Sequence, residues 1–108
     1  MSSTAHSFIH RGLGPMIRLS LSDGLSFDLT PREALTLARA LAAVKAGTSK
    51  VDEIYMSPIA SDQDFVGTVA PEGLLLQARQ PPIPLDWAEV GVISDQLKEL
   101  SPEEGQES

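Results

Sequence analysis

One stretch of the sequence carries both a start signal and a stop signal for a helix, and it constrains the fold more than any other. Thr30 and Glu33 have the spacing of a capping box, in which each side chain accepts a hydrogen bond from the backbone N–H of the other residue. Pro31 occupies the first helical position, where no N–H is needed. Gly47 follows the last turn, where a residue that adopts φ > 0 ends a helix well. The sequence therefore predicts a helix over residues 31–46.

This helix is amphipathic, because five apolar residues share one face at the helical period of about 3.6 residues. Such a helix lies on an apolar surface, which the rest of the chain must supply. Ala34, Ala38 and Ala42 form a row of small side chains, which either permits a close approach of another element or reflects the high helix propensity of alanine. Leu35 lies beside the stripe, where it could flank the core or contact a partner. The stripe consists of Ala34, Leu37, Ala38, Leu41 and Val44.

The segment before the helix, residues 17–29, alternates between apolar and polar residues in two runs. Such alternation is typical of strands with one buried face. A two-residue loop would place apolar residues opposite polar ones, whereas a three-residue loop that ends at Gly24 keeps all the apolar residues on one face. Gly24 would then adopt the left-handed conformation of a bulge. The predicted cross-strand pairs are Leu21 with Leu25, Leu19 with Phe27 and Ile17 with Leu29.

Three more strands are predicted after the helix. Residues 51–57 form one, and residues 65–79 form a second hairpin that turns at Pro71-Glu72-Gly73. A three-residue loop pairs Ala70 with Leu74 and leaves apolar side chains on both faces of the hairpin. A strand pair that is apolar on both faces needs cover on both. On the second face, the apolar side chains are those of Phe65, Val69 and Leu75.

A second helix is predicted over residues 86–100, after a stiff proline-rich connector at residues 80–84. Asp86 and Glu89 have capping-box spacing, whereas Gly91 and the β-branched residues around it oppose a helix. Trp87, at the helix start, could anchor either the core or an interface. The apolar stripe is narrow, like the seam between two helices, and consists of Val90, Ile93, Leu97 and Leu100.

The chain is expected to hold one domain, residues 16–100, between a disordered tail at residues 1–15 and a disordered acidic tail at residues 101–108. Met16, at the start of the first organised segment, is a candidate native start beside Met1. His6 and His10 both fall in the N-terminal tail, and two histidines leave a metal site short of ligands.

Composition excludes several classes of function. The net charge of −7 argues against general binding to nucleic acid or to an anionic membrane, because both need clustered basic residues. The absence of cysteine excludes thiolate catalysis and cysteine-ligated metals. No signal peptide and no apolar run of about 18 residues is seen, so a cytoplasmic location is expected. No catalytic motif is present, and we predict no catalytic, cofactor-binding or metal-binding residue.

The sequence therefore predicts an α+β domain with a mainly antiparallel sheet of about five strands, in the order β-β-α-β-β-β-α, and two helices packed on it. The expected function is a non-catalytic protein-interaction or assembly module, in which a homo-oligomer supplies the missing cover. Two alternatives remain: a small-molecule binder or enzyme with a pocket around Tyr55 and Trp87, and an acidic accessory protein for a basic protein partner. The residues predicted to contact a partner are Leu35, Phe65, Val69, Leu75, Trp87, Val90, Ile93 and Leu97.

Overall fold

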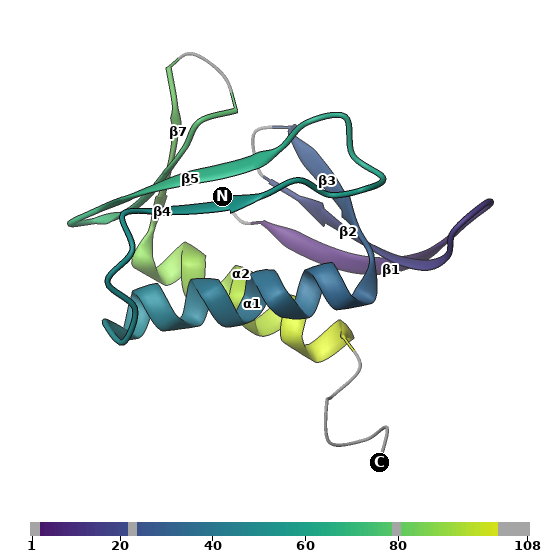
Figure 1. Cartoon of the computed structure of the whole chain (residues 1–108), viewed down its shortest axis with the longest axis horizontal. Helices are drawn as coiled ribbons and strands as arrows, with labels where there is room; N and C mark the ends of the chain where they lie inside the picture. Colours follow the sequence, from purple (N-terminus) through teal and green to yellow (C-terminus); the bar gives the residue numbers. More distant parts are fainter. Residues whose placement is uncertain (1–2, 22–23, 79–80, 102–108) are drawn as a thin grey trace.

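The computed structural model describes residues 3–21, 24–78 and 81–101. Seven strands and two helices are assigned among them, and Figure 1 shows their arrangement. In chain order the elements are β1 (Thr4–His10), β2 (Gly14–Ser20), β3 (Ser26–Leu29), α1 (Pro31–Ala46), β4 (Glu53–Met56), β5 (Phe65–Ala70), β6 (Gly73–Leu76), β7 (Ile83–Asp86) and α2 (Trp87–Leu100).

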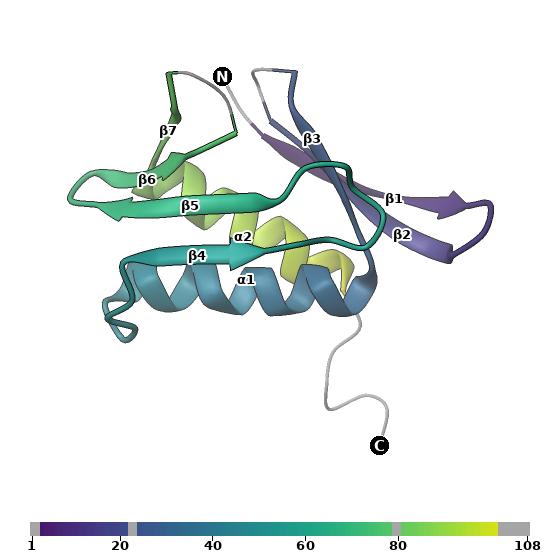
Figure 2. The ribbon, with the colours of Figure 1, turned by 45° about the horizontal axis from the view of Figure 1, so that its top comes forward.

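The strands form two antiparallel sheets, one in the order β1-β2-β3 and the other in the order β4-β5-β6-β7. Both helices lie on the same side of the two sheets, as the views in Figures 1 and 2 show. The predicted α+β class with two helices on antiparallel strands is confirmed, although the strands divide between two sheets. Phe27 and Phe65 join the sheets through an edge-to-face contact, with ring centroids 5.4 Å apart.

Helix α1 has the predicted caps. The Thr30 Oγ1 accepts from the Glu33 N–H at 3.1 Å, and the Glu33 carboxylate accepts from the Thr30 N–H at 2.9 Å. Gly47 ends the helix with φ 81°. The five residues of the predicted stripe are all buried. Local capping chemistry and the apolar stripe therefore suffice to predict this helix.

The two helices pack against each other where α1 carries small side chains. Ala34 and Ala38 are buried, whereas Ala42 is exposed, so only part of the alanine row serves close packing. At this contact the buried Ser94 hydroxyl of α2 donates to the Ala38 carbonyl at 2.8 Å. Helix α2 has the predicted N-cap, since the Asp86 carboxylate accepts from the Glu89 N–H at 2.8 Å, but the Glu89 side chain bonds to Ser3 and does not complete the predicted capping box.

The first predicted hairpin corresponds to β2 and β3, and its register is confirmed. Ile17 pairs with Leu29 and Leu19 with Phe27, and the Leu21 N–H donates to the Leu25 carbonyl at 2.8 Å. Gly24 has φ 86°, as the bulge requires. Ser22 and Asp23, the other two predicted loop residues, lie outside the described residues.

The prediction of a disordered tail over residues 1–15 is wrong for most of that segment. Residues 4–10 form β1, which pairs antiparallel with β2 along its whole length. The strand is held by tertiary contacts to α2, which sequence periodicity does not reveal. Of the predicted C-terminal tail, only Ser101 lies within the described residues.

The predicted register of the second hairpin is also wrong, by one residue. Ala70 pairs with Gly73, so the loop has two residues instead of three. Gly73 approaches the neighbouring strand so closely that a Cβ atom there would lie 1.9 Å from the Leu85 carbonyl oxygen. The shift places the side chains of Leu74 and Leu76 on the buried face. Residues 83–86, predicted as connector and helix start, form β7 beside them.

Candidate functional site

The structure places half of the predicted contact residues inside this chain. Four of them are at most 1% exposed, and the core uses their whole side chains, so the prediction that they face a partner is corrected. The corrected register of β5 and the packing of α2 on α1 explain this burial. These residues are Phe65, Val90, Ile93 and Leu97.

The other four do not form one surface. Val69 and Trp87 are half-buried against the core, and Leu35 is half-buried on α1. The Trp87 indole N–H donates to the Pro71 carbonyl at 2.8 Å, which ties the β5–β6 turn to the start of α2. Leu75, with 36% of its surface exposed, lies on the outer face of β6. A patch spanning all eight residues is therefore not formed.

The sheet edges give a more specific candidate, which begins with the contact between β1 and α2. In an antiparallel pair, each residue points both its N–H and its C=O either toward the neighbouring strand or away from it. The Ala5 N–H donates to the Gln96 side chain at 2.7 Å, so Ala5 points away from β2. The Gln96 amide in turn donates to the Ser3 carbonyl at 3.4 Å, and the Ser3 hydroxyl bonds to Glu89. Glu89 and Gln96 thus cover the first part of the β1 edge.

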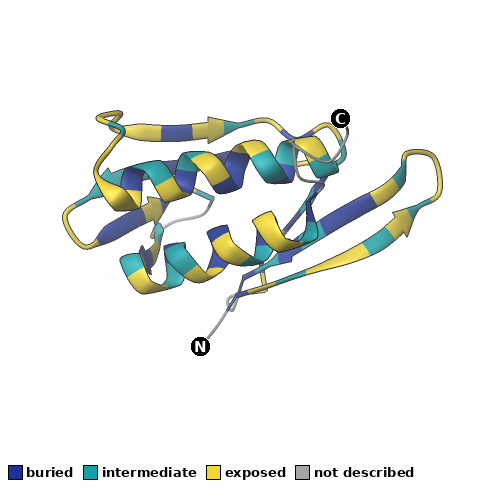
Figure 3. Cartoon of the chain, turned by 90° about the horizontal axis from the view of Figure 1, so that it is seen from below, coloured by how far each residue is buried: buried dark blue, intermediate teal, exposed yellow. Residues whose placement is uncertain are grey.

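Beyond Ala5 the same edge is uncovered. Because the direction alternates along the strand, Ser7 and Ile9 also point their N–H and C=O groups away from β2. Within residues 3–21, 24–78 and 81–101, these groups have no hydrogen-bonding partner. The Ile9 side chain is 75% exposed. Figure 3 shows why: the β1–β2 hairpin extends past the ends of both helices.

Two of the other sheet edges are blocked by specific residues. At β3, the Ser61 hydroxyl accepts from the Asp28 N–H at 2.6 Å and donates to the Asp28 carbonyl at 3.1 Å. At β7, the Trp87 N–H bonds to the Glu72 carbonyl, so the backbone of Trp87 faces β6. Because the direction alternates along the strand, Pro84 faces away from β6, and proline has no N–H to donate to an added strand. Blocking of this kind is how proteins prevent unwanted strand pairing.

The edge of β4 is shorter and differs in character. The Val69 N–H bonds to the Asp52 carbonyl, so Glu53 and Tyr55 are the outward residues of this four-residue strand. Glu53 carries a charge, which discourages pairing, and the Tyr55 hydroxyl is bound to Asp64. We therefore define the free edge as Ser7 and Ile9 of β1, because it has neither a blocking residue nor a charged one.

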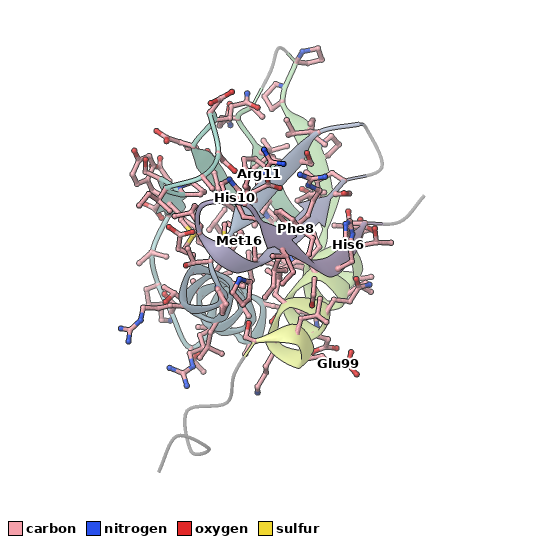
Figure 4. The ribbon with its side chains drawn as sticks, turned by 90° about the vertical axis from the view of Figure 1, so that its right-hand side faces the viewer. His6, Phe8, His10, Arg11, Met16 and Glu99 are labelled. Atoms are coloured by element: carbon pink, nitrogen blue, oxygen red, sulfur yellow. The ribbon has the colours of Figure 1, made fainter. Side chains whose placement is uncertain are left out.

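On the face of the β1–β2 hairpin that carries Phe8, a cation–π contact with Arg18 orders the side chains. The Arg18 guanidinium lies 4.7 Å from the centre of the Phe8 ring, and the Arg18 Nε bonds to Asp28 at 2.7 Å. The hydrogen bond and charge of Asp28 raise the pKa of Arg18, so this cation is permanent. Met16, cross-strand from Phe8, is buried on the same face. Figure 4 looks onto this hairpin, with Phe8, His10, Arg11 and Met16 labelled.

The turn at the hairpin tip is also ordered. The His10 Nδ1 accepts from the Gly12 N–H at 3.0 Å and from the Leu13 N–H at 3.1 Å. This nitrogen acts as an acceptor and is therefore not free for a ligand. The free edge thus lies on a hairpin whose turn and outer face are both held in place.

Tyr55 has a setting that does not match the predicted pocket. Its side chain lies on the sheet face opposite the buried Ile54, is 58% exposed, and donates to Asp64 at 2.8 Å. This hydrogen bond raises the pKa of Tyr55, against a smaller lowering by Ser57. A pocket between sheet and helix around Tyr55 and Trp87 is therefore not formed by Tyr55. In the part of the chain that the structure describes, no three His, Asp or Glu residues cluster as metal ligands would.

Comparison with known proteins adds no relative: no family model, curated protein or solved structure matches the chain. Neither of the helices within the described residues has the length and apolar character that crossing a membrane requires.

Sequence reasoning missed the free edge, because it assigned residues 1–15 to a tail. One signal was present: Phe8 and Ile9 favour strands, and the two glycines of the following turn, Gly12 and Gly14, suit a hairpin. That signal does not show which residues of β1 point outward, because their direction depends on the register in which β1 pairs with β2.

Proposed function

We propose that the chain is a non-catalytic protein-interaction module that binds an extended segment of a protein partner at the free edge of β1. The observation that supports this most is the outward-facing backbone of Ser7 and Ile9, next to an Ile9 side chain that is 75% exposed. In binding by strand addition, main-chain hydrogen bonds give affinity and alternate side chains give specificity.

The hairpin offers this edge in a form suited to binding. Its tip is ordered by the hydrogen bonds to His10, and its outer face by the stack of Arg18 on Phe8. An edge that is ordered before binding loses less conformational entropy when a partner adds to it.

The test uses proline, which removes an N–H group and is tolerated where that group faces solvent. Ile9→Pro removes an outward donor without removing a bond between β1 and β2. Ile59→Lys is the control, because Ile59 is 70% exposed and lies outside the strands. Each variant serves as bait in affinity purification from its source, after circular dichroism has verified its fold.

The proposal expects a partner that wild type and Ile59→Lys both retain and that Ile9→Pro loses. If Ile9→Pro retained the same partners as the wild type, the proposal would be contradicted, because such binding would not use the free edge of β1.

A further inference from the structure

We infer that the segment added to β1 is β1 of a second copy of this chain, in an antiparallel two-fold pairing centred on Phe8. This inference rests on the proposed function, whose partner it names. It is carried by the self-complementarity of the free edge.

The register follows from which residues are free. Ala5 is engaged by Gln96, so Ser7 and Ile9 are the β1 residues left to exchange hydrogen bonds. In a symmetric antiparallel pair, opposite residue numbers sum to a constant. Placing Ser7 opposite Ile9 of the second copy uses every free group on both strands. Placing Ser7 opposite Ser7 would put Ile9 opposite Ala5, which has no free N–H.

This register also brings matching side chains together. Phe8 faces Phe8 of the second copy at a pair without hydrogen bonds, where Cβ atoms lie about 4.5–5.5 Å apart. His6 faces His10 of the second copy on the same side of the sheet. On the opposite side the two Ile9 side chains become diagonal neighbours, within reach of each other. The pairing therefore covers the most exposed large apolar side chain described in the structure.

Charge complementarity supports a second copy as the partner. In this register Arg11, exposed in the hairpin turn, falls level with Ala5 of the second copy and so beside its α2. Helix α2 exposes Asp95 and Glu99 on its surface, and Figure 4 shows Glu99 on the same side of the molecule as the hairpin. The two-fold axis produces this contact twice. In a chain with a net charge of −7, such basic-to-acidic contacts favour association.

Cysteine cross-linking tests the register, because the protein contains no cysteine of its own. Disulfides need Cα atoms about 4.4–6.8 Å apart, and directly opposite residues at pairs without hydrogen bonds satisfy this. Variants of the full chain with one cysteine each, Phe8→Cys, His6→Cys and His10→Cys, are oxidised singly and in mixtures. Ile59→Cys measures cross-linking by random collision.

We expect Phe8→Cys to cross-link with itself. His6→Cys and His10→Cys should each form no disulfide when oxidised alone, because like residues in the two copies then lie about 13 Å apart along the strands. A mixture of these two variants should give a disulfide between them. Cross-linking of Phe8→Cys no greater than that of Ile59→Cys would overturn the inference, as would a His6→Cys variant that cross-links with itself.

Sedimentation measurements provide a second readout. Ile9→Pro removes a donor from each copy and should weaken dimerisation at least about tenfold, whereas Ile59→Lys should leave it unchanged. Arg11→Glu should weaken it several-fold, and Arg32→Glu on α1 should not. The wild-type protein could prove to be a strict monomer that binds a different protein, with Ile9→Pro abolishing that binding. This result would refute a second copy as the partner but support the proposed function. A monomer that shows no binding sensitive to Ile9→Pro would refute both.

Discussion

The Gln96 side chain occupies the place of a neighbouring strand beside Ala5. Its amide oxygen accepts the Ala5 N–H at 2.7 Å and its amide nitrogen donates to the Ser3 carbonyl at 3.4 Å. One side chain from α2 therefore holds the start of β1 and ends the edge that is open to pairing. It stabilises the start of β1 and sets where the free edge begins.

Replacing Gln96 by Ala should release the start of β1. We expect a loss of about 1 kcal/mol in the free energy of unfolding, measured with denaturant, because a backbone donor loses its partner. Gln77→Ala is the control, since that side chain is exposed and bonds to Thr68. The Gln96→Ala substitution also frees the Ala5 N–H, which permits the register with Ser7 opposite Ser7 of the second copy. A mixture of His6→Cys and Phe8→Cys should therefore cross-link in the Gln96→Ala background. An unchanged stability would show that Gln96 does not hold the strand.

Gly73→Ala should be severely destabilising. The added Cβ would lie 1.9 Å from the Leu85 carbonyl oxygen and 2.7 Å from the Asp86 Cα, both backbone atoms that cannot move without breaking the β6–β7 pair. We expect a loss of about 3 kcal/mol or more in the free energy of unfolding. Gly24→Ala, at φ 86° with open space around it, should cost about 1–2 kcal/mol. Equal costs for the two variants would contradict the close approach of β7.

Phe27 and Phe65 should be energetically coupled across the two sheets. Both are fully buried, and their rings meet edge to face at 62°. A double-mutant cycle with Leu at each position should give a coupling of about 0.5–1.5 kcal/mol in unfolding measurements. Phe8 provides the comparison, because it lies on the outer face of its sheet, and its coupling to Phe65 should be near zero. Additive effects at Phe27 and Phe65 would contradict direct contact.

The titration of Tyr55 should be displaced to high pH. Because the phenol donates to Asp64, its folded pKa lies above the ordinary value of about 10. A raised pKa means that the folded state holds the proton more tightly. The stabilisation is therefore fully present below about pH 10 and is lost as the pH rises through the folded pKa. Tyr55 is the only tyrosine, so ultraviolet absorbance reports it directly.

Asp64→Asn should lower this pKa toward its ordinary value, because the acceptor loses its charge. Asp62→Asn is the matched control in the same loop and should leave the titration unchanged. A Tyr55 titration that is insensitive to Asp64→Asn would show that the hydrogen bond is absent in solution.

The parts of the fold that sequence could predict are those settled by neighbouring residues. The ends of α1 depend on Thr30, Glu33 and Gly47, which act within one turn of the helix. The register of β2 and β3 follows from alternation and from Gly24, because the other register would mix apolar and polar faces. In both cases the competing structures were excluded by local chemistry.

Tertiary structure decided the second hairpin and the candidate site. Both registers around Gly73 bury apolar side chains, and packing against Leu85 selects one of them. The start of β1 is held by Gln96, which lies 91 positions from Ala5 along the chain, whereas the register in which β1 pairs with β2 sets Ser7 and Ile9 facing outward. The direction of each backbone group follows from the pairing register, which is known only once the strands have been brought together.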